Sequence, residues 1–215
     1  MTRICYFYIK TRGACSWNFS PLDRTARTPR ATAMRISDDR YSRDRLRLDL
    51  ALRFIGHEAR TRTIRTWTGL TDDRIRKLYR SYFDRSGATG ISRPRGRSPG
   101  LASFFIRSPR LKQEAAVLAS LCSLLGALPP RPQPRGIAQH PGIAQGIALC
   151  QAYEAYLALI PAARISFEHL VFLISALAGA EELALANCED CGALIVEDRF
   201  TIKAHRCPHC AHRAD

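Results

Sequence analysis

Two Cys-x-x-Cys pairs near the end of the chain constrain its fold more than any other feature. The pairs are Cys188/Cys191 and Cys207/Cys210, and fifteen residues separate the inner two. Zn²⁺ prefers four ligands at the corners of a tetrahedron, and each Cys-x-x-Cys turn presents two thiolates to one ion. The spacing falls in the range that is typical of zinc sites. We therefore predict that these four cysteines bind one structural zinc ion per chain.

The segment between the two pairs is expected to form a β-hairpin that closes the site. Residues 193–197 favour a strand, Asp198 and Arg199 favour a turn, and residues 200–204 would form the returning strand. Gly192 follows the first pair, where a residue without a Cβ lets the backbone bend around a sulfur. Four thiolates leave no open coordination position, so the metal is not expected to be catalytic.

The other thiols and the nearby imidazoles are expected to have other roles. Cys122 and Cys150 lie in helical patterns and should pack as core thiols, whereas Cys5 and Cys15 lie close to the N-terminus. Disulfides or redox chemistry are the alternative for the C-terminal pairs, but thiol clusters in a reducing compartment more often bind metal. Three histidines could each replace a cysteine, although we expect them to lie beside the site: His205, His209 and His212.

The charge of the chain favours a polyanionic partner. Lys and Arg number 33 against 19 Asp and Glu, which gives a net charge of +14. Contacts with phosphates draw much of their affinity from the release of counterions, so a basic protein of this kind favours nucleic acid. The alternative is a basic protein whose charge is only solvated.

No membrane segment is expected from the sequence. The longest apolar run covers residues 170–178, about half of the roughly 20 residues that a spanning helix needs. The N-terminus lacks the apolar stretch of an export signal. We therefore expect a cytoplasmic protein.

The spacing of apolar residues predicts a mainly α-helical fold with a small zinc-ribbon-like module at its end. We expect an N-terminal extension over residues 1–36 that is poorly ordered, with a natural start at or near Met34; a genuine basic arm is the alternative. A helical domain should cover residues 37–187, with a Pro-rich loop at 129–146, and a zinc-binding module residues 188–215. The predicted helices cover residues 42–60, 62–68, 72–83, 111–125, 147–159 and 166–186.

Residues 62–82 fit a helix-turn-helix pattern in most positions. Gly69 takes the turn, Thr71 is a suitable N-cap, and Arg65 departs from the pattern because a small residue usually stands there. The apolar places are held by Ile64, Leu70, Ile75 and Leu78. Arginine on an exposed helix can pair with phosphates or guanine edges. The candidate DNA-binding residues are three on the opposite face, Arg76, Lys77 and Arg80, and one on its shoulder, Arg74.

Three segments and the cysteine pairs occur in the order that is typical of the FlhC family. The segments are residues 54–83, which include RIRKLYR, residues 149–161 (LCQAYEAYLALIP), and residues 165–188, which lead directly into the first cysteine pair. Over about residues 42–212 the chain therefore resembles FlhC proteins, the zinc-containing subunits of the bacterial flagellar master regulator. The repeated GIAQ of the Pro-rich loop looks like an insertion relative to that family.

The resemblance implies a function in transcription. A protein of this family joins FlhD in a hetero-oligomer, and that complex binds promoter DNA and recruits RNA polymerase to flagellar operons. By resemblance, the four C-terminal cysteines stand where the zinc ligands of the family stand. The chain would therefore be a DNA-binding transcriptional activator subunit.

A protein-interaction module that zinc stabilises, without direct DNA binding, is the alternative function. Steep salt dependence of DNA binding would distinguish the two. An enzyme is not expected, because the sequence contains no phosphate-binding Gly loop, no His-Glu-x-x-His motif and no plausible open metal site.

Overall fold

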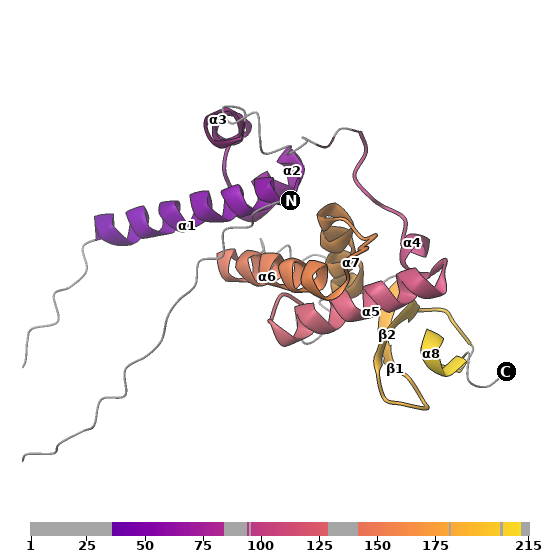
Figure 1. Ribbon diagram of the computed structural model, residues 1–215. Coiled ribbons are helices and arrows are strands. Elements are labelled where there is room, and N and C mark those ends of the chain that lie inside the picture. Colours follow the sequence, from indigo (N-terminus) through magenta and orange to yellow (C-terminus); the bar gives the residue numbers. More distant parts are fainter. Residues whose placement is uncertain are drawn as a thin grey trace, which may run out of the picture. The chain divides into compact units, whose positions relative to one another are not determined.

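The computed structural model describes most of the chain from Ile36 onward (Figure 1). The N-terminal extension, Met34, Cys5, Cys15 and most of the Pro-rich loop lie outside the described residues, as does His212. The described part is mainly helical, with one two-stranded antiparallel sheet, and this confirms the predicted fold class. It covers residues 36–83, 94, 96–128, 142–180, 182–202 and 204–211, with side chains from Arg40 onward.

None of the helices that the structure describes combines the length and the apolar character that a membrane crossing requires.

The first three helices pack against one another. They are α1 (Ile36–Gly56), α2 (Thr61–Thr68) and α3 (Asp72–Tyr82), and each contacts the other two. The prediction ended the first helix at residue 60, but α1 ends earlier because Glu58 adopts a left-handed conformation with φ of 57°. The backbone N–H of Ala59 then donates to the carbonyl of Phe54, which completes the helix end.

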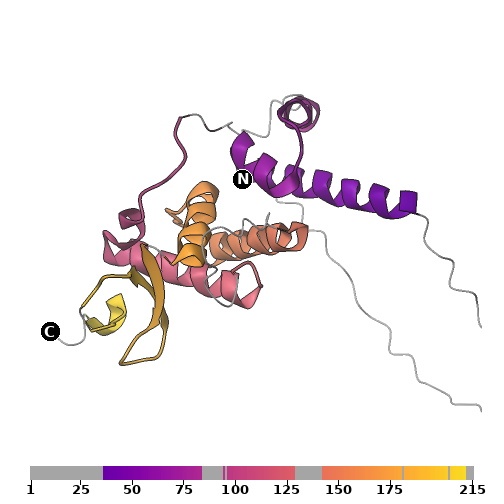
Figure 2. The same ribbon diagram turned by 180° about the vertical axis from the view of Figure 1, so that it is seen from behind.

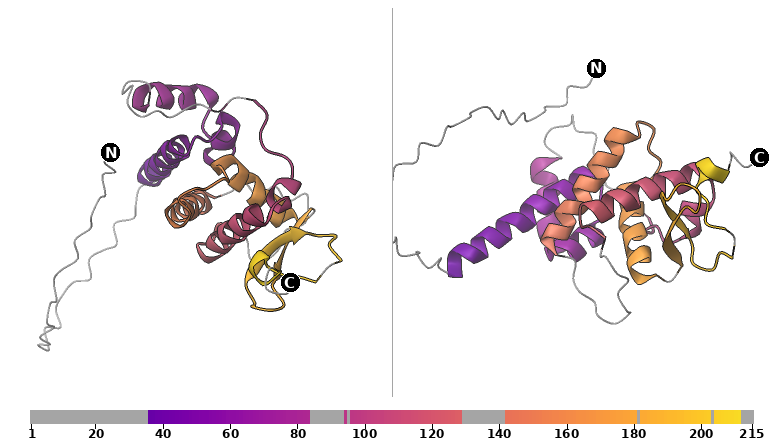
Figure 3. Two further views of the ribbon diagram at one scale, coloured as in Figure 1. Left: turned by 45° about the vertical axis from the view of Figure 1, so that its right-hand side comes forward. Right: turned by 90° about the horizontal axis from the view of Figure 1, so that it is seen from below.

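Four further helices form the second half of the helical body. They are α4 (Ser103–Ile106), α5 (Pro109–Leu124), α6 (Ile143–Leu159) and α7 (Phe167–Gly179). Helix α6 contacts α1 on one side and α5 on the other, and Figure 3 shows these helices in succession. The Phe104-Phe105-Ile106 anchor that the sequence suggested is present, with Phe105 fully buried.

The predicted loop 129–146 is too long at its C-terminal end. Helix α6 begins at Ile143, so the last four residues of the predicted loop belong to its first turn. Gly146 explains the difference, because it lies where α6 crosses α1 and α2. A Cβ at this position would come within 2.7 Å of Leu50 Cδ2 and 3.3 Å of Trp67 Cε3. Gly146, which interrupts the helical pattern of the sequence, therefore marks the close contact of α6 with α1 and α2.

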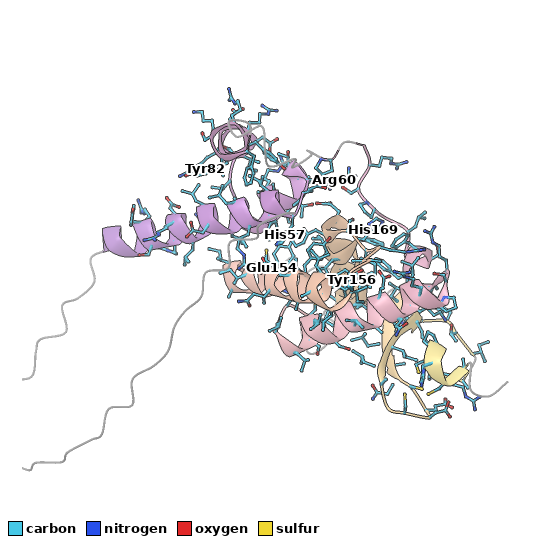
Figure 4. All side chains as sticks on the ribbon, viewed as in Figure 1. His57, Arg60, Tyr82, Glu154, Tyr156 and His169 are labelled. Carbon is cyan, nitrogen blue, oxygen red and sulfur yellow. The ribbon has the colours of Figure 1, made fainter. Side chains whose placement is uncertain are left out.

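Two carboxylates, Glu114 and Glu154, join the helices of the body. Figure 4 labels Glu154 and also Tyr156, which is a partner of Glu114. Glu114 of α5 is buried and accepts hydrogen bonds from the Tyr156 hydroxyl (2.6 Å), the Arg164 backbone N–H (2.9 Å) and the Arg110 guanidinium (3.0 Å). Burial alone would raise the pKa of Glu114, but these three donors hold that pKa below its usual value. Glu154 of α6 pairs with Arg53 on α1 at 2.9 Å.

The predicted helix over residues 166–186 is wrong in its last third. Helix α7 ends at Gly179, where Ala180 adopts a left-handed conformation with φ of 47°. The chain then enters β1 (Leu183–Asn187), which pairs with β2 (Leu194–Asp198) in antiparallel register, Leu185 opposite Val196. Alanine and leucine favour helices when isolated, but tertiary packing overrides that preference in β1.

The predicted β-hairpin is correspondingly wrong in its pairing. Residues 193–197 do form a strand, within one residue of β2, but its partner precedes the first cysteine pair instead of following it. Residues 200–204 form no strand in the part that the structure describes. The hairpin therefore carries Cys188 and Cys191 in the loop at its end. Figure 2 shows the hairpin of β1 and β2 from behind.

The contact at Gly146 can be tested by adding a side chain. We expect Gly146→Val to lower the free energy of unfolding by about 1–3 kcal/mol, because the buried Leu50 and Trp67 leave no room for it. Urea denaturation followed by circular dichroism measures the change. Ala144→Val is the matched control. Ala144 is exposed in the same turn, so this substitution should cost only the difference in helix propensity, about 0.5 kcal/mol. Equal losses in both variants would contradict the close contact.

Candidate functional site

The structure brings the four predicted cysteines together. Their sulfur atoms all lie within 4.8 Å of one another, and Sγ of Cys191 is 3.8 Å from Sγ of Cys207. Bonds of about 2.3 Å to a tetrahedral metal would place two thiolate sulfurs about 3.8 Å apart. A disulfide would need about 2.05 Å. Cys188, Cys191, Cys207 and Cys210 can therefore hold one metal ion, as the spacing predicts.

Two tight backbone turns hold the sulfurs in place. In the first, the N–H of Cys188 donates to the carbonyl of Ala193, and the N–H of Gly192 donates to the carbonyl of Cys188, both at 2.8 Å. Gly192 has a φ of 71°, which confirms that this turn needs a residue without a Cβ. In the second, α8 (Pro208–Ala211) begins directly after Cys207.

Backbone N–H groups also point at the sulfurs. The N–H of Cys207 donates to Sγ of Cys188 at 3.3 Å, and the N–H of Cys210 donates to Sγ of Cys207 at 3.4 Å. The bond from Cys207 is the main cause that lowers the pKa of Cys188 to about 6. The same bond favours the thiolate of Cys188, which is the form that binds a metal ion.

The pKa of Cys210, in the same cluster, is shifted in the opposite direction. Hydrogen bonding to the neighbouring Cys207 sulfur raises the pKa of Cys210 to about 12, so this thiol holds its proton. A metal ion that binds here must displace that proton. Metal affinity therefore falls as the pH falls.

The β1–β2 hairpin has two faces with different partners. Leu183 and Val196 lie on one face and belong to the main core, against which α5 packs. Ala186 and Ile195 lie on the other face and pack with the cysteines in a small separate cluster. Because side chains alternate along each strand, the same hairpin contacts the cysteine cluster on one face and the helical body on the other.

Polar residues beside the cluster fix the segment that leads to the second cysteine pair. The ring of His205 pairs through Nδ1 with Glu197 Oε2 at 2.5 Å, and this bond raises the pKa of His205. The backbone N–H of Glu189 donates to the carbonyl of His205 at 2.8 Å. Within the described residues, the group of possible metal ligands contains cysteines alone. His205 therefore lies beside the site, as expected, and His209 is exposed on α8.

The two cysteines of the helical body lie apart from the C-terminal cysteine cluster. Cys122 and Cys150 are fully buried, and burial raises the pKa of each thiol to about 12. Both belong to the main hydrophobic core. The prediction that they are core thiols is confirmed.

The helix-turn-helix prediction matches the local structure of α2 and α3. Gly69 ends α2 in a left-handed conformation with φ of 69°, and α3 begins after Thr71. Ile64, Leu70 and Ile75 are buried, as the pattern requires, and the fourth apolar residue of the pattern is half-buried. Thr71 occupies the N-cap position, but its side chain makes no hydrogen bond to the helix.

Two contacts in the turn were not evident from the sequence. The Thr68 hydroxyl donates to the carbonyl of Ile64 at 2.7 Å and accepts from the N–H of Leu70 at 3.3 Å. Arg65, which departs from the usual pattern, is exposed and pairs with Asp72 across the turn at 3.6 Å. Because its side chain points to solvent, a large residue is tolerated at that position.

The basic residues predicted on α3 share its exposed side. Each lies three or four residues from another, so they are neighbours on the helix surface. One of them, Arg76, pairs with Asp73 at 2.9 Å. On the buried side, the hydroxyl of Tyr79 donates to the carbonyl of Ala59 at 3.1 Å and fixes α3 on the chain before α2. The four exposed residues are Arg74, Arg76, Lys77 and Arg80.

Comparison with known proteins identifies no family for this chain. Neither a protein-family model nor a curated protein sequence matches it. The cysteine cluster and the basic side of α3 are therefore the two features from which a function can be argued.

A metal ion held by the four cysteines would stabilise the loop of the hairpin and the C-terminal segment, but not the paired strands. We expect a chelator to speed hydrogen exchange at residues 188–193 and 204–211 by more than about tenfold, which corresponds to about 1.4 kcal/mol of local stability. The β1–β2 ladder should keep its protection, because its other face packs on α5. Cys188→Ser should reproduce the effect without a chelator, and Cys122→Ala should not. Loss of protection along the whole hairpin would contradict this account.

Proposed function

We propose that this protein is a DNA-binding transcriptional activator subunit of the FlhC type, which acts with FlhD at promoters of flagellar operons and recruits RNA polymerase. The observation that carries the proposal is the α2–turn–α3 unit, in which an apolar side is buried and four basic residues are exposed on α3. A helix of this kind can enter the major groove of DNA, with its basic side chains near phosphates and base edges. The net charge of +14 supports the same partner.

The metal in this proposal is zinc, and its role is structural. Four thiolates in a tetrahedral arrangement are typical ligands of Zn²⁺, and they leave no coordination position for a substrate. The ion would join the turn at Cys188 to the one at Cys207 and so fix the C-terminal segment on the hairpin. The protein would not be an enzyme, and it would act in the cytoplasm.

A protein-interaction module remains the second candidate, and one observation favours it. Phe200 and Ile202 lie in the loop between the two cysteine pairs, with exposed fractions of 77% and 101%. Large apolar side chains in that position are suited to contact with another protein. Such contact is compatible with the leading proposal, because a subunit that acts with a partner needs a second surface.

The DNA proposal is tested on α3. We expect Arg80→Ala to weaken binding to a flagellar promoter fragment by about 1 kcal/mol or more, equivalent to about a fivefold higher Kd, because a contact with a phosphate or a base is lost. Fluorescence anisotropy of labelled duplex DNA measures the affinity. The chain should be co-expressed with FlhD, so that the complex is the species that is titrated.

Arg164→Ala is the matched control for this measurement. Arg164 is exposed in the connection between α6 and α7, and its removal changes the net charge equally. If both variants bind like the wild type, Arg80 is not in the DNA site. If wild-type binding is weak and does not depend on salt, the interaction-module function replaces the DNA-binding one.

A further inference from the structure

A hollow with a basic lining lies at the start of α2, separate from the exposed side of α3. Its volume is about 740 Å³, and its wall is formed by residues from the start of α2, by Pro94 and by residues 96–98. Among the described residues that line it, none is acidic and three are arginines: Arg60, Arg62 and Arg97. Figure 4 labels Arg60, which immediately precedes α2.

Arg60 holds the two walls of the hollow together. Its guanidinium donates to the carbonyl of Gly96, which ties the segment 96–98 to the start of α2. Its Nε lies 3.7 Å from Oε2 of Glu168, and Oε1 of Glu168 accepts from the backbone N–H of Arg60 at 2.7 Å. Glu168 therefore offsets the charge of Arg60, which acts as a positioning residue.

Arg62 and Arg97 supply the remaining positive charge. Both are exposed, and they reach the same hollow from segments that are distant in the sequence. Like charges repel, so bringing them to one hollow becomes favourable when an anion lies between them. The planar guanidinium matches the oxygens of a phosphate with two parallel hydrogen bonds. The first turn of α2 also contains no acidic residue that would compete for these arginines.

We propose that this hollow binds one phosphate of the DNA backbone through Arg62 and Arg97. The inference rests on the proposed function, because α2 is the first helix of the helix-turn-helix unit, and this helix crosses the DNA backbone in such motifs. A phosphate held here would fix the orientation in which α3 approaches the groove. Such contacts position a protein on DNA but do not read its sequence.

The test compares Arg97→Gln with Arg164→Gln, each of which removes one exposed positive charge. Affinity for a duplex is measured over a series of salt concentrations. Loss of one phosphate contact should make the slope of log K against log salt shallower by about 0.9 in Arg97→Gln, whereas the Arg164→Gln slope should equal that of the wild type. The effect should be the same for duplexes of different sequence. Arg62→Gln serves as a second variant in case Arg97→Gln does not fold.

A second readout uses inorganic phosphate and does not depend on DNA. Phosphate should raise the thermal unfolding midpoint of the wild type and of Arg164→Gln above its value in chloride of equal ionic strength, but not that of Arg97→Gln. An Arg97→Gln slope equal to the wild-type slope would overturn the inference and leave the proposed function standing. A wild type that binds no duplex would overturn the proposed function and the DNA ligand together. Equal protection of all three proteins by phosphate would rule out the hollow as a phosphate site.

Discussion

The position of the cysteine cluster depends on the packing of one hairpin between two hydrophobic clusters. Val196 and Ile195 are neighbours in β2, yet Val196 packs into the main core and Ile195 packs under the cysteines. Because side chains alternate between the two faces of a strand, the five residues of β2 contact both hydrophobic clusters. The cysteine cluster is therefore attached to the helical body through β2, which packs against α5, and Cys188 follows directly after β1.

Helix α7 connects this end of the molecule to the helix-turn-helix unit. At its beginning, Glu168 accepts the backbone N–H of Arg60 just before α2, and beyond its end the chain enters β1. The stacking of Phe167 on His57 and its edge contact with Phe54 add apolar support to the same junction. The start of α2 and the hairpin that carries the first cysteine pair are thus held by one helix.

The sequence was most informative where local chemistry determines local structure. The Cys-x-x-Cys spacing identified the four clustered sulfurs, and Gly192 and Gly69 identified two turns with positive φ. The apolar spacing of Ile64, Leu70 and Ile75 identified the helix-turn-helix unit for the same reason. All of these features depend on residues that are close in the chain.

Features that arise from packing between elements, and that have no sequence motif of their own, were missed. The residues of β1 are good helix formers, and only pairing with β2 and contact with the main core make them a strand. The start of α6 could not be placed without the contact of Gly146 with Leu50 and Trp67. The bond from Arg60 to Glu168 joins residues 108 positions apart, and no local pattern indicates it.

X-ray absorption at the zinc edge of the purified protein would show directly whether four thiolates enclose one structural metal ion. We expect one zinc per chain with four sulfur neighbours at about 2.3 Å and no nitrogen neighbour. A shell that contains an imidazole nitrogen, at about 2.0–2.1 Å, would place a histidine such as His205 in the site and contradict the all-thiolate arrangement. Protein purified under reducing conditions that neither contains nor takes up zinc would contradict the metal assignment itself.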